Sequence, residues 1–361
     1  MNGEAFEEYI RHKEPTKAEK GYAWQTAIGL QAVDGIKTSE YLKQTAIRSI
    51  EGEIDFTEAQ ALLDSYYREN AVHSPDGRTE EADKVSARIA QLLSEKAFTF
   101  SSGEYIGIHE RLFRGLYKHA GKIRDYNISK QEWVLDGKSV LYGNSFELRA
   151  ALEYDLEQER NFSYKGLSQD EIITHLARFV SRLWQIHAFC EGNTRTTAVF
   201  FIKYLRYLGY EAANDIFAQN AWYFRNALVR ANYNDLRADI HETTEFLELF
   251  LRNLLLNEKN ELHNRSMHIS GTLSTKQDID REKQDIDREK QDIGTVLSPH
   301  QQKQFEKIAA EFGGETVFGR GDVAELLGIT ASPASALIKK LADVGKIEPV
   351  AGHGKGKYTV K

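Results

Sequence analysis

A nine-residue segment of the chain concentrates side chains that suit phosphate chemistry. It consists of His187-Ala188-Phe189-Cys190-Glu191-Gly192-Asn193-Thr194-Arg195. Gly192 and Asn193 come at the start of a predicted helix, where unpaired backbone N–H groups and the helix dipole favour an anion. Arg195, in the first turn of that helix, is placed to hold phosphate oxygens with two hydrogen bonds. The segment therefore predicts an anion site.

Two further residues of the segment extend this site to catalysis. Glu191 offers carboxylate oxygens beside the anion, and such ligands suit Mg²⁺ better than zinc. His187, at the other end of the segment, is placed to act as a general base on an incoming hydroxyl. Taken singly, a histidine between helices is usually a core residue, and a Gly-Asn pair is usually a cap and turn. The combination is not what packing requires, and it favours a chemical site.

The segments on either side predict the helices that must position these groups. Residues 171–186 carry apolar side chains at helical spacing, which predicts a buried helix. Residues 196–210 are apolar on nearly every side and end near Gly209, which predicts a second buried helix. The nine residues are therefore expected to form the loop between two core helices, with Phe189 as its hydrophobic anchor.

The segment resembles the signature of the Fic (filamentation induced by cAMP) family, H-P-F-x-[D/E]-G-N-G-R-x-x-R. The resemblance implies that His187 deprotonates a target hydroxyl and that Glu191 binds Mg²⁺. It also assigns ATP phosphate binding to Gly192, Asn193, Thr194 and Arg195. The usual reaction of the family is transfer of AMP from ATP to a Ser, Thr or Tyr of another protein. The implied activity is that of a protein adenylyltransferase with ATP and Mg²⁺ as cofactors.

Three positions depart from the family signature. Ala188 replaces Pro, Thr194 replaces the second Gly, and Ala198 stands where the second Arg is expected. In the family that Arg helps to fix the nucleotide and pairs with an inhibitory Glu. In the Doc (death on curing) branch of the same fold the second Gly and second Arg are also replaced, and the γ-phosphate is transferred. Protein phosphorylation is therefore the alternative reaction.

Residues 131–142 contain two short alternating runs around Asp136-Gly137, which predict a β-hairpin. Within the resemblance, which covers roughly residues 35–255, this segment corresponds to the Fic flap. An exposed hairpin edge can hold an extended target segment by strand addition and bring its hydroxyl to His187. The residues predicted to dock the target are Val134, Leu135, Asp136, Gly137, Lys138, Ser139 and Val140.

A shorter motif, Ser49-Ile50-Glu51-Gly52, resembles the inhibitory helix of Fic proteins that carry this regulator N-terminal to the core. The helix is predicted at about residues 45–54, although Ile47 stands where the family has a hydroxyl. A carboxylate in the γ-phosphate site repels the phosphate and occupies an arginine. In this chain the partner of the carboxylate would be Arg195 or another basic side chain. Inhibition within one chain and between protomers both stay open, and so does a homodimer.

The C-terminal residues 297–361 resemble a winged helix-turn-helix module. Helices are expected at 301–312, 321–328 and 332–344, followed by two strands around a Gly-rich wing at 352–356. The third helix would present Ser332, Ser335, Lys339 and Lys340 for recognition. The module holds nine Lys or Arg against seven Asp or Glu, which is only weakly basic. DNA binding and protein contact are both open, and a DNA-binding regulator with a degenerate Fic core is a further alternative.

These predictions divide the 361 residues into four parts. They are a helical region at 1–95, a catalytic core at 96–256 with the flap 131–142 and motif 187–195, a polar linker at 257–296, and the module at 297–361. The linker repeats Lys-Gln-Asp-Ile-Asp-Arg-Glu. The expected fold is mainly α, a Fic-type helical bundle with a β-hairpin flap, plus a small α+β winged-helix domain.

Composition bounds the class of protein. The net charge of −7 implies no general attraction to nucleic acid or to anionic membranes. The single cysteine, Cys190, excludes internal disulfides and fits a reducing cytoplasm. The sequence shows no signal peptide and no apolar run of membrane length. We therefore expect a cytoplasmic protein without a membrane partner, and the Fic resemblance implies that its substrate is a protein hydroxyl.

Overall fold

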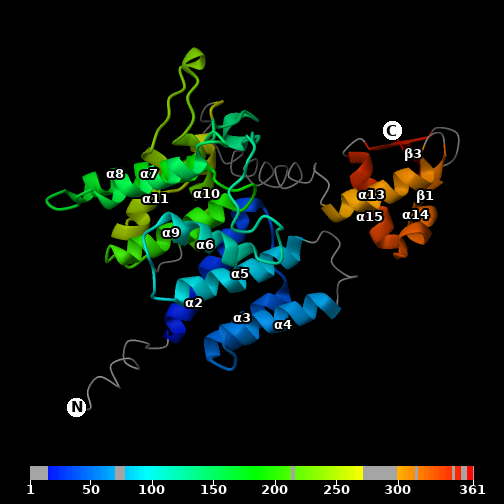
Figure 1. Cartoon of the computed structure of the whole chain (residues 1–361), viewed down its shortest axis with the longest axis horizontal. Coiled ribbons are helices and arrows are strands. Elements are labelled where there is room, and N and C mark those ends of the chain that lie inside the picture. The colour runs from blue at the N-terminus through cyan, green and yellow to red at the C-terminus, as the bar shows by residue number, and fades with distance from the viewer. Residues whose placement is uncertain are drawn as a thin grey trace. The chain divides into compact units, whose positions relative to one another are not determined.

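The computed structural model describes residues 15–69, 78–212, 216–270, 299–313, 316–343, 346–350 and 356–360. These residues divide into two compact units. The first unit contains the described residues up to Ser65 and from Glu81 to residue 270, and the second contains the described residues among 66–80 and from 299 onward. Both are largely helical (Figure 1). The prediction of a mainly α fold with a small β part is confirmed.

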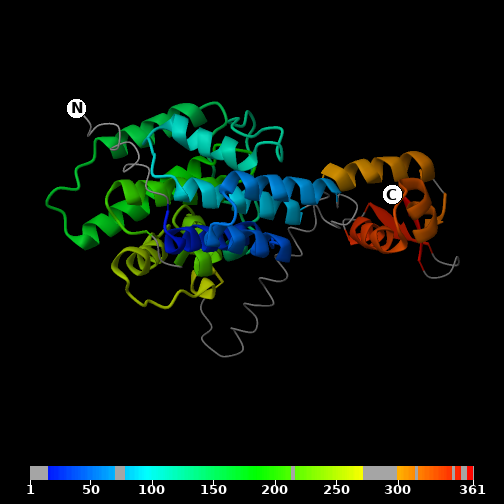
Figure 2. The same ribbon diagram turned by 90° about the horizontal axis from the view of Figure 1, so that it is seen from below.

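The helices between residues 17 and 267 lie in the first unit, except that the end of α4 and the start of α5 belong to the second. They are α2 (Lys17–Gly29), η1 (Leu30–Asp34), α3 (Glu40–Glu51), α4 (Phe56–Glu69), α5 (Arg78–Ser94), α6 (Ser102–Phe113), η2 (Trp133–Leu135), α7 (Leu148–Arg160), α8 (Gln169–Ile186), α9 (Asn193–Tyr207), α10 (Ile216–Arg230), η3 (Leu236–Ala238), α11 (Glu245–Leu256) and η4 (Asn264–Met267). The α2 and α3 helices, blue in Figure 2, pack on each other, and α2 also contacts α10.

The α9 helix forms the centre of the first unit. All of its residues from Asn193 to Leu205 are buried, and it contacts α6, α8 and η1. The α8 helix begins at a capping box in which Ser168 and Glu171 bond each other's backbone N–H groups, a motif that stabilises a helix by about 1 kcal/mol. The prediction that two buried helices flank residues 187–195 is confirmed.

Residues 131–142 do not form the predicted β-hairpin. The turn itself is present, because Lys138 N–H donates to Leu135 C=O at 3.1 Å and both Asp136 and Gly137 have positive φ. No strand flanks it in this segment, and η2 occupies residues 133–135 instead. The reason is burial: Val134 and Leu135 are adjacent and both 0% exposed, whereas a half-exposed strand alternates its faces.

From residue 299 onward, the described part of the second unit contains three helices and a three-stranded sheet. Its elements are α13 (Pro299–Phe312), β1 (Phe318–Gly319), α14 (Arg320–Leu327), α15 (Ala331–Asp343), β2 (Ile347–Pro349) and β3 (Lys357–Val360). The sheet has the order β1-β3-β2 with antiparallel pairs. A separate apolar core includes Ile308, Phe318, Val323 and Leu341.

Some predicted features fall outside the described residues. The heptapeptide repeats at 276–293 do so entirely, and the wing at 352–356 does so except for Gly356. Residues before them are described: Met267 of η4 is buried in the core of the first unit, and Ile269 N–H donates to Val134 C=O at 2.9 Å. Among the described helices, none combines the length and the apolar character that crossing a bilayer requires.

Candidate functional site

His187 ends α8 in a constrained conformation. Its backbone has φ 50° and ψ 55°, a left-handed geometry that costs a residue with a Cβ roughly 1–2 kcal/mol. The Arg124 guanidinium donates to the His187 carbonyl at 2.8 Å. The imidazole lies against Tyr142 and Trp184, with ring centroids 4.2 and 5.2 Å away. These contacts hold the ring in one position.

The His187 imidazole is neutral and without a hydrogen-bond partner. Both ring nitrogens are buried and unpaired within the part of the chain that the structure describes. Burial lowers the pKa of His187 well below its usual range, and the positive charges of Lys130 and Arg124 lower it further. A neutral imidazole carries a free lone pair at pH 7, which is the form that a general base requires.

Asn193 closes the loop through its own side chain. Its Oδ1 accepts from Phe189 N–H at 2.9 Å, and its Nδ2 donates to Phe189 C=O at 2.7 Å. The Phe189 ring is 0% exposed and stacks on His109 with centroids 3.7 Å apart. Phe189 is thus the anchor that the sequence predicted, and the Asn193 amide is used to shape the loop.

Gly192 is required where the loop meets α9. Its φ is 77°, and a Cβ at this position would lie 2.3 Å from the Phe113 ring, so only glycine fits. No side chain caps α9 at this end, which leaves the first backbone N–H groups of the helix for an anion. Thr194 contributes only its backbone here, because its Oγ1 accepts from Trp184 Nε1 at 3.0 Å.

Arg195 is held by carboxylates in the interior of the first unit. Its side chain is 1% exposed, and its Nε lies 2.7 Å from Asp34 Oδ2. Its Nη2 lies 2.6 Å from Glu81 Oε1, and its Nη1 donates to Gln31 Oε1 at 3.1 Å. Burial alone would lower the pKa of the guanidinium, but Asp34, Tyr117 and Glu81 outweigh it and raise the pKa. Arg195 is therefore charged and already paired.

Sequence analysis did not identify Asp34 or Glu81 as partners of the loop. Asp34 ends η1 and Glu81 lies near the start of α5, so both are far from Arg195 along the chain. No local spacing links them to it, and only a covarying set of relatives would reveal the pairs. Arg195 would have to exchange these two carboxylates before it could hold a phosphate.

Glu191 is the charged group of the loop that reaches solvent. Its side chain is 56% exposed and pairs with Lys130 Nζ at 3.3 Å, while its carbonyl accepts from His109 Nε2 at 3.0 Å. In the described ranges, no group of three or more His, Cys, Asp or Glu could hold a metal ion. Glu191 thus offers one carboxylate, which fits Mg²⁺, since this ion commonly takes one or two carboxylates together with substrate phosphates.

Glu51 lies on the surface at the end of α3. Its carboxylate pairs with Lys17, and Gly52 caps the helix in the left-handed conformation with φ 83°. The structure therefore does not bring Glu51 to Arg195, whose partners are Asp34 and Glu81. An inhibitory role of Glu51 remains a prediction that requires both pairings to change.

The predicted flap residues differ in accessibility. Val134, Leu135 and Val140 are buried, whereas Asp136, Gly137 and Lys138 are exposed and Ser139 is half-buried. Lys138 also pairs with Asp235 at 2.9 Å. Of the seven predicted docking residues, only those around the turn present side chains or backbone at the surface.

A buried ion pair behind the turn was also missed. Glu132, which is 0% exposed, pairs with Arg225 Nη2 at 2.7 Å. Glu132 also accepts from Tyr142 Oη at 2.8 Å. Because the Tyr142 ring contacts His187, this pair fixes one wall of the histidine site.

Comparison with known proteins gives a family match that includes this region. Residues 99–205 match the model of the Fic/DOC family. The chain is also similar to a solved structure, the N-terminal FIC domain of Bep8, a VirB-translocated Bartonella effector protein from Bartonella sp. 1-1C. The identity is 20% over 47% of this chain and 81% of that chain, with a TM-score of 0.35. The family match includes the whole loop 187–195, and the chain therefore contains a Fic/DOC family domain at residues 99–205.

Proposed function

We propose that the chain is a protein adenylyltransferase that transfers AMP from ATP to a Ser, Thr or Tyr of a target protein. The observation that carries the proposal is the neutral His187 imidazole, buried without a partner at the start of the loop that ends at the uncapped α9. A buried polar group left unpaired costs about 1–3 kcal/mol. Together with the Fic/DOC match, this cost supports a chemical role.

In the proposed reaction His187 takes the proton of the target hydroxyl. The hydroxyl oxygen forms a bond to the α-phosphorus of ATP. The bond from that phosphorus to the oxygen that bridges it to the β-phosphorus breaks, and pyrophosphate leaves. The N–H groups at the start of α9 would stabilise the phosphate charge. Glu191 would hold Mg²⁺, which neutralises phosphate charge when bound, after Lys130 releases its carboxylate.

Phosphotransfer of the Doc type is the alternative reaction. It is favoured by Thr194 and Ala198, because the second Gly and the second Arg of the signature are also replaced in the Doc branch. The pairing of Arg195 with Asp34 and Glu81 does not distinguish the two reactions, since both need the phosphates of ATP to be held. The two reactions differ in which phosphorus the hydroxyl attacks, and an isotope distinguishes them.

The test is label transfer from ATP carrying ³²P at either the α- or the γ-position, with Mg²⁺ and cell lysate. His187→Ala is the blank. Label from the α-position, lost in the blank, supports adenylyl transfer, whereas label only from the γ-position supports phosphotransfer. Absence of both, under conditions where the protein is folded, would contradict an enzymatic role.

Inhibition by Glu51 is part of the proposal. Glu51→Gly should raise both self-modification and ATP affinity if its carboxylate enters the γ-phosphate site. Glu53→Gly is the matched control, because Glu53 is an exposed acid nearby that pairs with Arg48 at 3.3 Å. Equal behaviour of the two variants would reject a specific role for Glu51.

The second unit suggests DNA binding as a second candidate function. Its order of helix, strand, two helices and two strands, with a three-stranded antiparallel sheet, supports a winged helix. The α15 helix would enter the major groove and expose Ser335 and Lys339. Salt-dependent duplex binding that Lys339→Glu weakens and Lys307→Glu does not, without any label transfer, would support a DNA-binding regulator.

A further inference from the structure

A cavity outside the loop 187–195 lies on α4, α5 and α6 of the first unit. Its volume is ≈230 Å³, and it is lined by Gln60, Arg88, Gln91, Arg111 and Arg114. The lining is thus three guanidiniums and two amides, without an acid, on a chain whose net charge is −7. Pockets for drug-sized molecules measure about 300–1,000 Å³ and are mostly apolar. This smaller and polar cavity suits a compact anion.

The three arginines differ in how they are paired. Arg111 holds Glu95 through two bonds, of 2.7 and 2.5 Å. Arg114 pairs with Glu110 at 2.8 Å on its own helix. Arg88 has no ion pair with a carboxylate in the described residues, and its Nη1 donates to the carbonyl of Leu112 at 2.8 Å.

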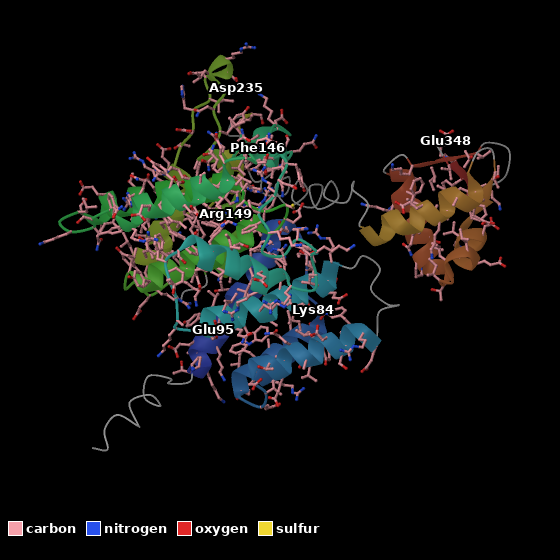
Figure 3. All side chains as sticks on the ribbon, viewed as in Figure 1. Lys84, Glu95, Phe146, Arg149, Asp235 and Glu348 are labelled. Carbon is pink, nitrogen blue, oxygen red and sulfur yellow. The ribbon has the colours of Figure 1, made fainter. Side chains whose placement is uncertain are left out.

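Arg88 is therefore a half-buried cation with little compensation. Burial lowers the pKa of its guanidinium, Asp64 raises it, and Arg114 lowers it again. Asp64 itself pairs with Lys84 at 2.7 Å. Figure 3 labels Lys84 on α5 and Glu95 just beyond the end of that helix. A charge partly removed from water costs free energy that a bound anion would recover.

We propose that this cavity binds a phosphate group, carried either by a small free phosphate compound or by a phosphorylated side chain. The planar fork of arginine matches phosphate oxygens, which accept two parallel hydrogen bonds. The Gln60 amide donates to Gln91 Oε1 at 2.6 Å, so the Gln91 carbonyl oxygen already has a donor. The three guanidiniums and the Gln91 amide thus place hydrogen-bond donors and positive charge around one cavity.

Binding should be measured by isothermal titration calorimetry on the full chain at low ionic strength. The probes are inorganic phosphate, pyrophosphate and a phosphoserine peptide, with succinate as a carboxylate control. Arg88→Gln and Arg114→Gln should each raise the Kd of the best probe at least tenfold. Arg149→Gln, the same change at an exposed arginine of α7, should leave the Kd unchanged.

Arg88 also donates to the Leu112 carbonyl near the end of α6. A loss of binding in Arg88→Gln alone could therefore reflect a loss of stability. Arg114 is largely exposed, and its variant, with the melting temperature measured without ligand, separates binding from stability. Tightest binding of the peptide would identify a phosphorylated protein, and tightest binding of pyrophosphate a free ligand. Four results would overturn the site: no binding of any probe, undiminished binding in both cavity variants, an equal loss in Arg149→Gln, or succinate binding as tight as that of phosphate.

Discussion

His109 should make the stability of the first unit depend steeply on pH. It lies on α6 and is 0% exposed. Its Nδ1 accepts from Gly121 N–H at 2.9 Å, and its Nε2 donates to Glu191 C=O at 3.0 Å. Only the neutral ring can accept and donate in this way. Burial lowers the pKa of His109 to about 4, against the bond to Glu191, which raises it.

The magnitude follows from the difference between the folded and unfolded pKa values. An unfolded histidine has a pKa of about 6.5. Because the folded pKa is lower, the stabilising contribution is fully present above pH 6.5 and is lost as pH falls toward 4. The free energy of unfolding should drop by about 2 kcal/mol between pH 7 and pH 5 through this residue alone, and by about 3.4 kcal/mol well below pH 4.

Urea unfolding at pH 7, 6 and 5 tests this value. All four tryptophans, Trp24, Trp133, Trp184 and Trp222, lie in the first unit, so their fluorescence reports that unit. His109→Phe keeps the ring but cannot titrate. The variant should be less stable at pH 7, by about 1–3 kcal/mol for the unpaired groups it leaves. Its loss between pH 7 and 5 should be smaller than that of the wild type by about 2 kcal/mol.

An equal pH dependence of the two proteins would refute the reasoning, because it would mean that His109 is protonated equally in the folded and unfolded chain. His187 also has a lowered pKa and destabilises the fold in acid with the same sign. It is present in both proteins, so it cancels in the difference. The comparison therefore isolates the contribution of His109.

Three further predictions concern the loop itself. Gly192→Ala should destabilise the first unit by about 1–3 kcal/mol in urea unfolding, because a Cβ would lie 2.3 Å from the Phe113 ring. Arg195→Met should cost about 3–5 kcal/mol in the same assay, since it removes the guanidinium that neutralises Asp34 and Glu81 in the interior. The transfer rate should show no acid limb near pH 6.5 in a pH–rate profile, because the pKa of His187 is lowered well below this value.

Each of these has a contrary result. Unchanged stability of Gly192→Ala would mean that the Phe113 ring moves aside freely. A cost of less than 1 kcal/mol for Arg195→Met would mean that Asp34 and Glu81 reach water. A rate that halves near pH 6.5 would mean that the His187 imidazole is solvated before the substrate arrives.

Sequence analysis predicted the features that depend on residues close together in the chain, and it missed those that depend on contacts between distant residues. Apolar spacing located α8 and α9, because a buried helix leaves a local pattern. The Asp136-Gly137 turn was also predicted correctly, since the backbone conformations that these residues favour are local. The strands beside it were wrong, because Val134 is buried by contacts from elsewhere in the fold, among them the hydrogen bond from Ile269.

The environment of Arg195 shows the same limit for the site. The family signature places an arginine there, but its charge partners come from η1 and α5. Which acids meet a buried guanidinium is decided by tertiary packing, and no spacing within 187–195 encodes it. The chemical inventory of the loop was therefore predictable, while its pairing was not.

The burial of α9 limits where the sequence of such a protein can vary. The helix that begins at the loop 187–195 is also the one whose residues from Asn193 to Leu205 are all inside the fold. A close-packed helix cannot tilt or slide without opening a void, so its end is as immobile as the core. New specificity can then arise only in the surface segments around the loop. Substitutions that change specificity are therefore expected in the segments that approach the N-terminus of α9, and not in α9 itself.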